Sequence, residues 1–445
     1  MHAILASMIL LSLPQAPQQS LLREIIPNPT GRNGYEEYLM ACDVVRSTRV
    51  AELLVLPEQL RAVVRDYESS ERPVDEWNEK LAKPNLERYL FAKKHQDLSQ
   101  LQLRREAVRV AGSALDLLAK GNRKQVLDPR AEKKWDTTFP EFAQMRLLAR
   151  LVVAGAYVAY ADGQPARGNQ YLMDSFEFGH RIGNGILIAR LVGAAIQSTT
   201  FQAYEKLLPL MTAVDARKII DAVPSWIPNP PVAVAALDSE FAFMQRNLAG
   251  MFDQVEDANG VLFNDERKSN AEKTASDFLG RMTLADKQRV IQICNEHLVK
   301  QRQKLGNSYR RPESEWDIPV EVEAEYLNTR AVRSADDFGE FVSSQITPAF
   351  TQVGSLEVRT RTQFRLLRLS AAVVRYKWEH DKFPLNLVEA VGEDNMADPA
   401  SGEKFQYEVL GNGFRVWSKG TARTGEIGLK YVRTQAGDEG TPPPV

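Results

Sequence analysis

Hydrophobic residues recur at intervals of three and four positions along most of the chain, and this spacing places them on one face of an α-helix. In the first third, Asn33 has the position of an N-cap, with Glu36 and Glu37 in the first turn after it. The pattern predicts four helices in this part. The first begins after Asn33, and the second runs from Pro57 to Tyr67. The third lies between Val74 and Gln96, with an interruption or restart at Pro84, and the fourth runs from about Leu101 to Lys120.

The clearest local pattern lies between residues 142 and 183. A helix ends at the turn Asp162-Gly163-Gln164-Pro165, and a second helix follows it. The small residues Gly155, Gly168 and Ser175, with aromatic residues between them, resemble a tetratricopeptide-type hairpin, in which helices approach closely where side chains are small. Three such units at a fixed period of about 34 residues are not found, so an ordinary antiparallel helix pair stays open beside a repeat array.

Further helices are predicted from Ile186 to Leu208, Val214 to Val223, Val232 to Phe252, Ala285 to Leu305 and about Ser334 to Ile346. Between the second and third of these, the stretch PSWIPNPPV holds four prolines, which disfavour a regular helix and indicate a linker or a rigid corner. Residues 253–274 have the composition of a polar loop. We therefore expect a helical domain at residues 33–223 and a second helical segment at residues 224–355.

The last long helix is predicted from Val358 to Asp381. Its hydrophobic residues repeat at 3-4-3-4 spacing and form one stripe, while its arginines point mostly elsewhere. The stripe consists of Phe364, Leu367, Ala371, Val374 and Trp378, and the arginines are Arg359, Arg361, Arg365, Arg368 and Arg375. Because a hydrophobic helix face is normally covered by other elements of the fold, we expect Trp378 in the core.

Strand patterns occur only near the C-terminus. Phe405, Tyr407 and Val409 alternate with polar residues, Gly411-Asn412-Gly413 forms a turn, and Phe414, Val416 and Ser418 alternate on the return. A third strand through Ile427, Leu429 and Tyr431 would complete a small sheet, and residues 434–445 have the composition of a disordered tail. The predicted fold class is mainly α: a multi-helix array with one or more tetratricopeptide-like hairpins, followed at residues 358–433 by a small α+β module of a long helix and an antiparallel hairpin or three-stranded sheet.

The order of elements in this module resembles a known family. The long helix leads to His380-Asp381-Lys382-Phe383-Pro384, then to a short helix ending at Val391, to Asp398-Pro399, and to Gly402 before the hairpin. This order is similar to the C-terminal globular module of type II secretion major pseudopilins, over residues 359–420. The resemblance implies the fold of the module only.

Two features limit which pseudopilin properties we expect of this chain. A pilin subunit has its assembly helix directly at the N-terminus, whereas more than 300 residues precede the module here. The pseudopilin calcium loop needs clustered acidic oxygens, and residues 418–428 offer only Glu426. We therefore expect neither pilus assembly nor calcium binding. The whole layout also resembles a set of large exported helical proteins of planctomycete-like bacteria, and that resemblance implies no activity.

Residues 1–19 are interpreted as a signal peptide or an uncleaved N-terminal anchor. The hydrophobic run from Ala3 to Leu13 fits a signal-peptide core and is too short to span a bilayer. A later hydrophobic run, from Leu147 to Tyr160, contains Arg150 and reads as a core helix. We expect a periplasmic or extracellular protein, in which Cys42 and Cys294 could pair or stay free.

The overall composition is that of a folded protein, with 44% hydrophobic and 26% charged residues. Lys and Arg number 56 against 58 Asp and Glu, so no basic field would draw the chain to nucleic acid. HExxH, CxxC, GxSxG, Walker-type and GxGxxG strings are absent. The sequence accordingly predicts no catalytic residue, no cofactor and no metal ligand.

Two carboxylate groupings are candidates for chemistry. The first is a pair whose side chains are not placed to act together, and the second is more typical of a solvated acidic edge than of a glycosidase or metal site. Asp238 and Glu240 lie two positions apart on one helix and face different directions, and three glutamates alternate at positions 321, 323 and 325. Six tryptophans could line a groove, although such residues more often fill a core. Among them, Trp417 is the predicted contact residue, because it lies on the strand face opposite Phe414 and Val416.

These observations favour an exported, non-catalytic scaffold or protein-interaction protein of the cell envelope. Stacked helical hairpins produce surfaces suited to peptides or partner helices, so the expected partner is a protein or peptide, with membrane contact only through an uncleaved N-terminus. A narrower version involves a secretion system. The alternatives are an exported hydrolase that uses carboxylates of the helical body, and a structural protein facing lipid or cell wall.

Overall fold

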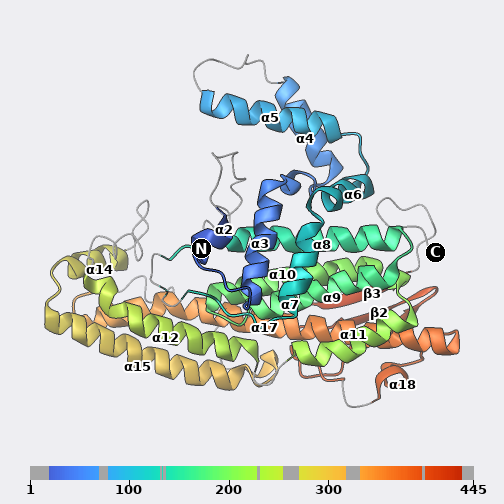
Figure 1. The fold of residues 1–445 in the computed structure, drawn as a ribbon. Coiled ribbons are helices and arrows are strands. Elements are labelled where there is room, and N and C mark those ends of the chain that lie inside the picture. Colours follow the sequence, from blue (N-terminus) through green and yellow to red (C-terminus); the bar gives the residue numbers. More distant parts are fainter. Residues whose placement is uncertain are drawn as a thin grey trace.

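The computed structural model describes residues 20–69, 79–130, 133, 137–227, 231–253, 270–316, 331–392 and 396–432. The N-terminal segment 1–19, the tail 434–445, Trp77, Trp135 and the glutamates at 321–325 lie outside the described residues. Within them the chain is mainly helical, with a three-stranded antiparallel sheet close to the C-terminus (Figure 1). The predicted fold class is confirmed.

The longer helices are α3 (Gly34–Ser47), α4 (Pro57–Ser69), α5 (Glu79–His95), α6 (Gln100–Ala111), α7 (Ser113–Asn122), α8 (Glu141–Ala161), α9 (Pro165–Ile182), α10 (Leu187–Leu207), α11 (Ala213–Trp226), α12 (Val232–Asp253), α14 (Asn270–Gly280), α15 (Leu284–Ser308) and α17 (Ala335–His380). Short helices are α2 (Leu21–Ile25) and α18 (Leu387–Val391), and the strands are β1 (Gln406–Leu410), β2 (Gly413–Ser418) and β3 (Ile427–Val432).

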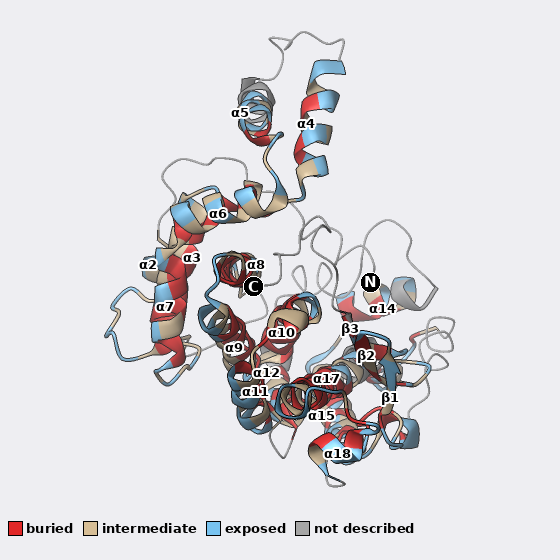
Figure 2. Cartoon of the chain, turned by 90° about the vertical axis from the view of Figure 1, so that its right-hand side faces the viewer, coloured by how far each residue is buried: buried red, intermediate tan, exposed pale blue. Residues whose placement is uncertain are grey.

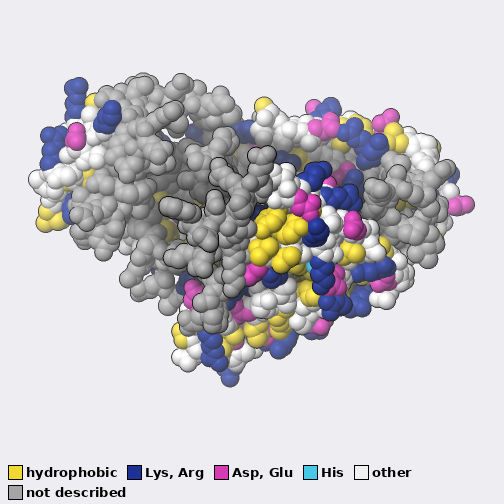
Figure 3. All heavy atoms as spheres, turned by 90° about the horizontal axis from the view of Figure 1, so that it is seen from above, with side chains coloured by type: hydrophobic (Ala, Val, Ile, Leu, Met, Phe, Trp, Pro, Cys, Tyr) yellow, Lys and Arg dark blue, Asp and Glu magenta, His cyan; other side chains and the backbone are white. Residues whose placement is uncertain are grey.

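The N-terminal helices α3, α6, α7 and α8 pack around one hydrophobic core, which buries Cys42 as a free thiol. Asn33 caps α3 as predicted, because its side chain accepts the Tyr35 backbone N–H at 3.1 Å. The hairpin of α4 and α5 projects from this body (Figure 1). Seen from the side of that hairpin, side chains of both charges surround a group of hydrophobic ones (Figure 3).

Helices α8, α9 and α10 form the centre of the array. The predicted α8–α9 hairpin is present, and a Cβ on Gly168 would lie 2.5 Å from the Tyr160 ring. Helix α10 approaches α9 more closely still, since a Cβ on Gly193 would lie 2.3 Å from the Gly179 carbonyl oxygen. Among the described residues, α8 has the length and hydrophobicity of a membrane-spanning helix, and 61% of that stretch is buried inside the fold, as in a core helix.

Two helices extend further than the sequence predicts. Helix α11 continues through Pro224 to Trp226, whose buried indole N–H donates to Glu177 at 3.0 Å. Helix α17 is continuous over 46 residues, so the boundary expected between residues 355 and 358 lies inside it. The helix continues through Gly354, where the missing side chain leaves room for the Tyr309 ring. A Cβ at this position would lie 2.1 Å from that ring.

Shorter differences occur elsewhere. The predicted helix at 101–120 divides at Gly112 into α6 and α7, and α14 begins at Asn270 within the stretch expected to be a loop. Cys294 is buried and free, in a core formed by α12, α14, α15 and the first half of α17.

The C-terminal sheet has the order β1-β2-β3 and confirms the three-stranded alternative. Phe414, Val416 and Leu429 are buried in a core shared with α9, α10, α11 and the second half of α17. Figure 2 shows buried positions gathered where these helices and the sheet meet. The module is therefore packed into the helical body and has no separate core.

The Asp398-Pro399 turn fixes the module in place. The buried Asp398 carboxylate accepts hydrogen bonds from the hydroxyls of Ser401 and Ser418, both at 2.6 Å, and from the Ala400 N–H at 3.0 Å. Residues after α15 reach the same turn, because the Glu313 N–H donates to the Pro399 carbonyl at 3.1 Å. The turn thus links the sheet, α17 and the helical body.

Candidate functional site

The buried carboxylates of the helical body are engaged in structural contacts. Glu141 accepts from the Tyr35 hydroxyl at 2.8 Å and from Arg130 at 2.7 Å. Glu37 accepts from Lys124, and Glu357 from Arg190. Within the described ranges, no group of three or more His, Cys, Asp or Glu side chains is placed to hold a metal ion.

The pair at positions 238 and 240 divides between two different environments. Asp238 forms an exposed ion pair with Arg302, whereas Glu240 is largely buried and accepts the Leu187 N–H at 3.0 Å. Burial raises the pKa of Glu240, and the Leu187 hydrogen bond lowers it in part. The two carboxylates do not act as a pair.

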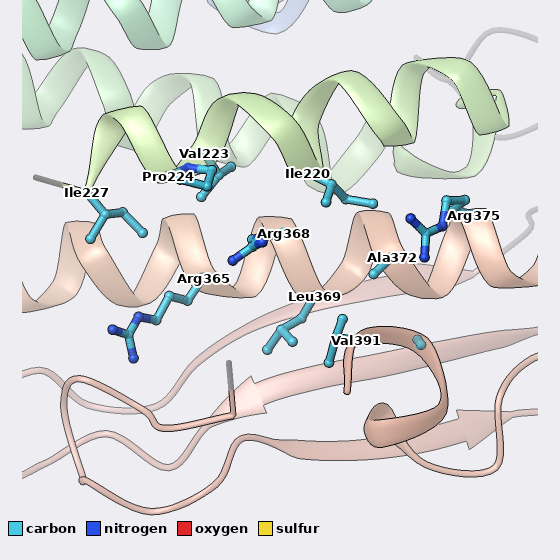
Figure 4. Close-up of a pocket in the computed structure, with 11 residues that line it drawn as sticks. Ile220, Val223, Pro224, Ile227, Arg365, Arg368, Leu369, Ala372, Arg375 and Val391 are labelled. Carbon is cyan, nitrogen blue, oxygen red and sulfur yellow. The ribbon is translucent and has the colours of Figure 1, made fainter. Parts of the chain in front are cut away.

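The described residues do form a groove along α17, with α11 on one side and α18 on the other, and with a volume of about 440 Å³ (Figure 4). One wall is hydrophobic and comes from α11, through Ile220, Val223 and Ile227. The floor comes from α17 and carries arginines (Figure 4). The lining residues are Ile220, Val223, Pro224, Ile227, Arg365, Arg368, Leu369, Ala372, Arg375, Ala390 and Val391. We call this the arginine groove.

Helical spacing places the arginines of the groove in one row. Arg368 follows Arg365 by one turn, and Arg375 follows two turns later, so the row extends over about 15 Å of helix. Burial lowers the pKa of Arg365, as do the charges of Arg361 and Arg368, while Asp398 acts in the opposite direction. These guanidinium groups repel one another in a partly desolvated site, so a bound anion would be favoured there.

The arginines point to different parts of the groove. Arg365 extends from α17 on the side away from α11 and donates to the Ala397 carbonyl (Figure 4). Arg375 lies between the two helices, and its Nε is buried with no hydrogen-bond partner, 3.5 Å from the Glu379 carboxylate. Arg375 thus forms an ion pair with the half-exposed Glu379, one turn further along α17.

Trp378 lies one turn beyond Arg375 on α17 and is not one of the residues that line the groove. Helix α11 runs antiparallel to α17, so Ile227 lies near Arg365 and Ile220 near Arg375 (Figure 4). In the same register, the Trp378 indole N–H donates to the Met211 carbonyl, just before α11, at 3.1 Å. The expectation that Trp378 is in the core is wrong, because its side chain is 63% exposed at the end of α17.

Trp417, the contact residue predicted from the sequence, lies on β2 at some distance along the chain from this groove. Its side chain is half-buried on the outer face of the sheet, and the Arg415 guanidinium covers its ring at 4.6 Å. Arg415 also pairs with Glu426, the one acidic residue of the following loop. A role of Trp417 in partner binding stays a prediction.

Sequence reasoning did not identify the arginine groove. The signal was present, because positions 365, 368 and 375 share one helix face and positions 220, 223 and 227 share another. The pattern does not show that α11 and α17 lie side by side, or how they are aligned, because more than 100 residues separate them in the sequence.

Comparisons with protein-family models, curated proteins and solved structures found no match to this chain. The resemblance of the C-terminal module to pseudopilins therefore depends on the residues of this chain alone.

Proposed function

We propose that this protein is an exported, non-catalytic interaction protein of the cell envelope, and that it binds an acidic peptide segment of a protein partner in the arginine groove. The observation that carries the proposal is the row of Arg365, Arg368 and Arg375 along a groove with a hydrophobic wall. Arginine side chains bind carboxylates through paired, charge-assisted hydrogen bonds, and they are enriched at protein interfaces.

The dimensions of the groove favour an extended segment. A row of about 15 Å corresponds to four or five residues of an extended peptide, at about 3.3 Å per residue. In such a peptide, alternate side chains point in opposite directions, so acidic residues can face α17 while hydrophobic ones face Ile220, Val223 and Ile227. A segment of alternating acidic and hydrophobic residues is therefore the best match.

The binding test uses a fluorescein-labelled peptide of alternating Glu and Leu, with the Gln–Leu peptide as its uncharged control. We expect the acidic peptide to bind and the control to bind at least about tenfold more weakly, since a hydrogen bond to a charged group contributes about 1.5–3 kcal/mol. Raising the salt concentration should weaken binding.

Charge reversal locates the site. Arg375→Glu should lower the affinity for the acidic peptide by about tenfold or more, whereas Arg359→Glu should leave it unchanged. Arg359 is a matched control because it is exposed on the same helix and does not line the groove. Equal affinity for both peptides, or equal effects of the two substitutions, would contradict the proposal.

Export is tested separately, on the protein made in its own cells with a C-terminal tag. The sequence of residues 1–19 supports recovery from the envelope or the medium, either shortened by signal cleavage or anchored by an intact N-terminus. Mass spectrometry of the purified protein distinguishes these forms. Recovery from the cytosol with residues 1–19 intact would contradict export.

A further inference from the structure

Trp378 is exposed in an unusual way for a large hydrophobic side chain. Among the described residues, it is the one aromatic side chain in the exposed hydrophobic set, with 63% of its surface open. Its indole N–H is already bonded to the Met211 carbonyl. The ring is therefore fixed at one edge while much of its hydrophobic surface remains in water, which is the state of an aromatic contact residue before binding.

The surroundings of Trp378 connect it to the arginine groove. It follows Arg375 by three positions, which is about 4.5 Å along the helix axis. On the other side of the groove, Val388 and Leu385 are also exposed, close in the chain to the lining residues Ala390 and Val391. The Tyr376 hydroxyl donates to Glu389 at 3.3 Å, and this contact holds α18 beside the end of α17.

We infer that Trp378 determines the specificity of the groove, by receiving a hydrophobic side chain that lies just beyond the last acidic residue of the bound segment. The inference rests on the proposed function and names its partner more closely: an acidic segment followed by a hydrophobic residue. Charge complementarity sets the order, because the cationic row ends at Arg375 and the exposed indole comes next. Tryptophan and arginine are the residue types that most often dominate binding energy at interfaces.

The test compares two acidic peptides that differ only at the final residue, Leu in one and Ser in the other. The same comparison is made at the first residue, because the residues of the groove do not fix the direction in which the peptide lies. We expect the peptide ending in Leu to bind about tenfold more tightly than the other, which is the size of effect that a tryptophan contact commonly produces. Trp378→Ala should remove this difference, so that the peptides ending in Leu and in Ser bind with equal affinity. Trp378→Phe, which keeps an aromatic ring, should restore part of it.

The control is Trp417→Ala, which should leave both affinities unchanged if Trp378 alone discriminates. Binding of both peptides to the wild-type protein with equal affinity would overturn this inference and leave the proposed function intact. Failure of both peptides to bind would overturn the two together. Loss of discrimination in Trp417→Ala and not in Trp378→Ala would assign the contact to the sheet instead. A change in tryptophan fluorescence that occurs on addition of anionic lipid vesicles and not of peptide, and that Trp378→Phe removes, would overturn the inference in favour of a lipid surface.

Discussion

The ion pair between Arg190 on α10 and Glu357 on α17 offers a sharp test of how the C-terminal half is joined to the body. Their side chains are 2% and 3% exposed, and the Arg190 Nη2 lies 2.8 Å from the Glu357 Oε2. Arg190 Nε makes a second contact with the same oxygen at 3.1 Å, and Gln197 accepts from Nη1 at 3.3 Å. The proposed change is Glu357→Gln, which keeps the shape and removes the charge.

Without its counter-charge, the Arg190 guanidinium would stay buried in a site that offers only neutral acceptors. Breaking a buried ion pair from one side costs about 3–5 kcal/mol. The new amide oxygen can still accept one hydrogen bond, so we expect a loss near the lower limit, about 3 kcal/mol. Replacing both residues with hydrophobic ones, Arg190→Met with Glu357→Leu, should be far less destabilising than Glu357→Gln alone, because no unpaired charge remains.

Urea unfolding followed by circular dichroism measures both variants. With an m-value of about 3 kcal/mol/M, a loss of about 3 kcal/mol lowers the midpoint by about 1 M. Two results would refute the reasoning: a loss below about 1 kcal/mol for Glu357→Gln, or a double variant as unstable as the single one. Either would mean that water or a rearranged neighbour stabilises the lone guanidinium.

Four further variants test other parts of the fold by the same unfolding measurement. Gly193→Ala should destabilise the fold by about 1–2 kcal/mol, because overpacking against the Gly179 carbonyl outweighs the helix propensity of alanine. Its control, Gly306→Ala in α15, has open space around it and should be neutral or stabilising. Equal effects of the two substitutions would refute the close approach of α10 to α9. Burial lowers the pKa of His180 below its usual 6.5, so the unfolded state takes up a proton that the folded state does not, and stability should fall as pH falls below about 6.5. His180→Gln should flatten this part of the profile, and an unchanged slope would contradict the assignment. Asp398→Ala should destabilise by about 2–3 kcal/mol by leaving buried donors without an acceptor, and a loss under about 0.5 kcal/mol would show that water replaces the carboxylate.

Much of the fold could be predicted from local chemistry. Asn33 begins α3, Pro165 begins α9, and the alternation from Phe405 to Ser418 gives the first two strands of the sheet. The exceptions share one cause. The sequence predicts a helix end before Pro224 and a break ahead of Val358. Instead, α11 continues to Trp226, whose indole N–H bonds to Glu177, and α17 runs without a break past Gly354, which lies against the Tyr309 ring. In both places the longer helix comes with a contact to a residue distant in the chain.

The site could be predicted only in part, for a related reason. The 3-4-3-4 stripe correctly identifies the buried face of α17 through Val374, but periodicity does not show where the covering elements end. Figure 1 shows the C-terminal end of α17 extending past α11, and Trp378 precedes the last residue of that helix, His380, by two positions. The same stripe that buries Phe364 therefore exposes Trp378.

The groove is also a consequence of how the module docks. One wall belongs to α11 of the body, the opposite side to α18 of the module, and the floor to α17, which joins the two. Helix α17 carries Glu357 in the buried ion pair, and Arg365 only two turns later. A change that shifts α17 against α10 should therefore move the arginine row relative to Ile220 and Val223. Peptide affinity would then fall in Glu357→Gln even though Glu357 does not line the groove. Unchanged affinity in a folded Glu357→Gln variant would show that α11, α17 and α18 keep their arrangement without the ion pair.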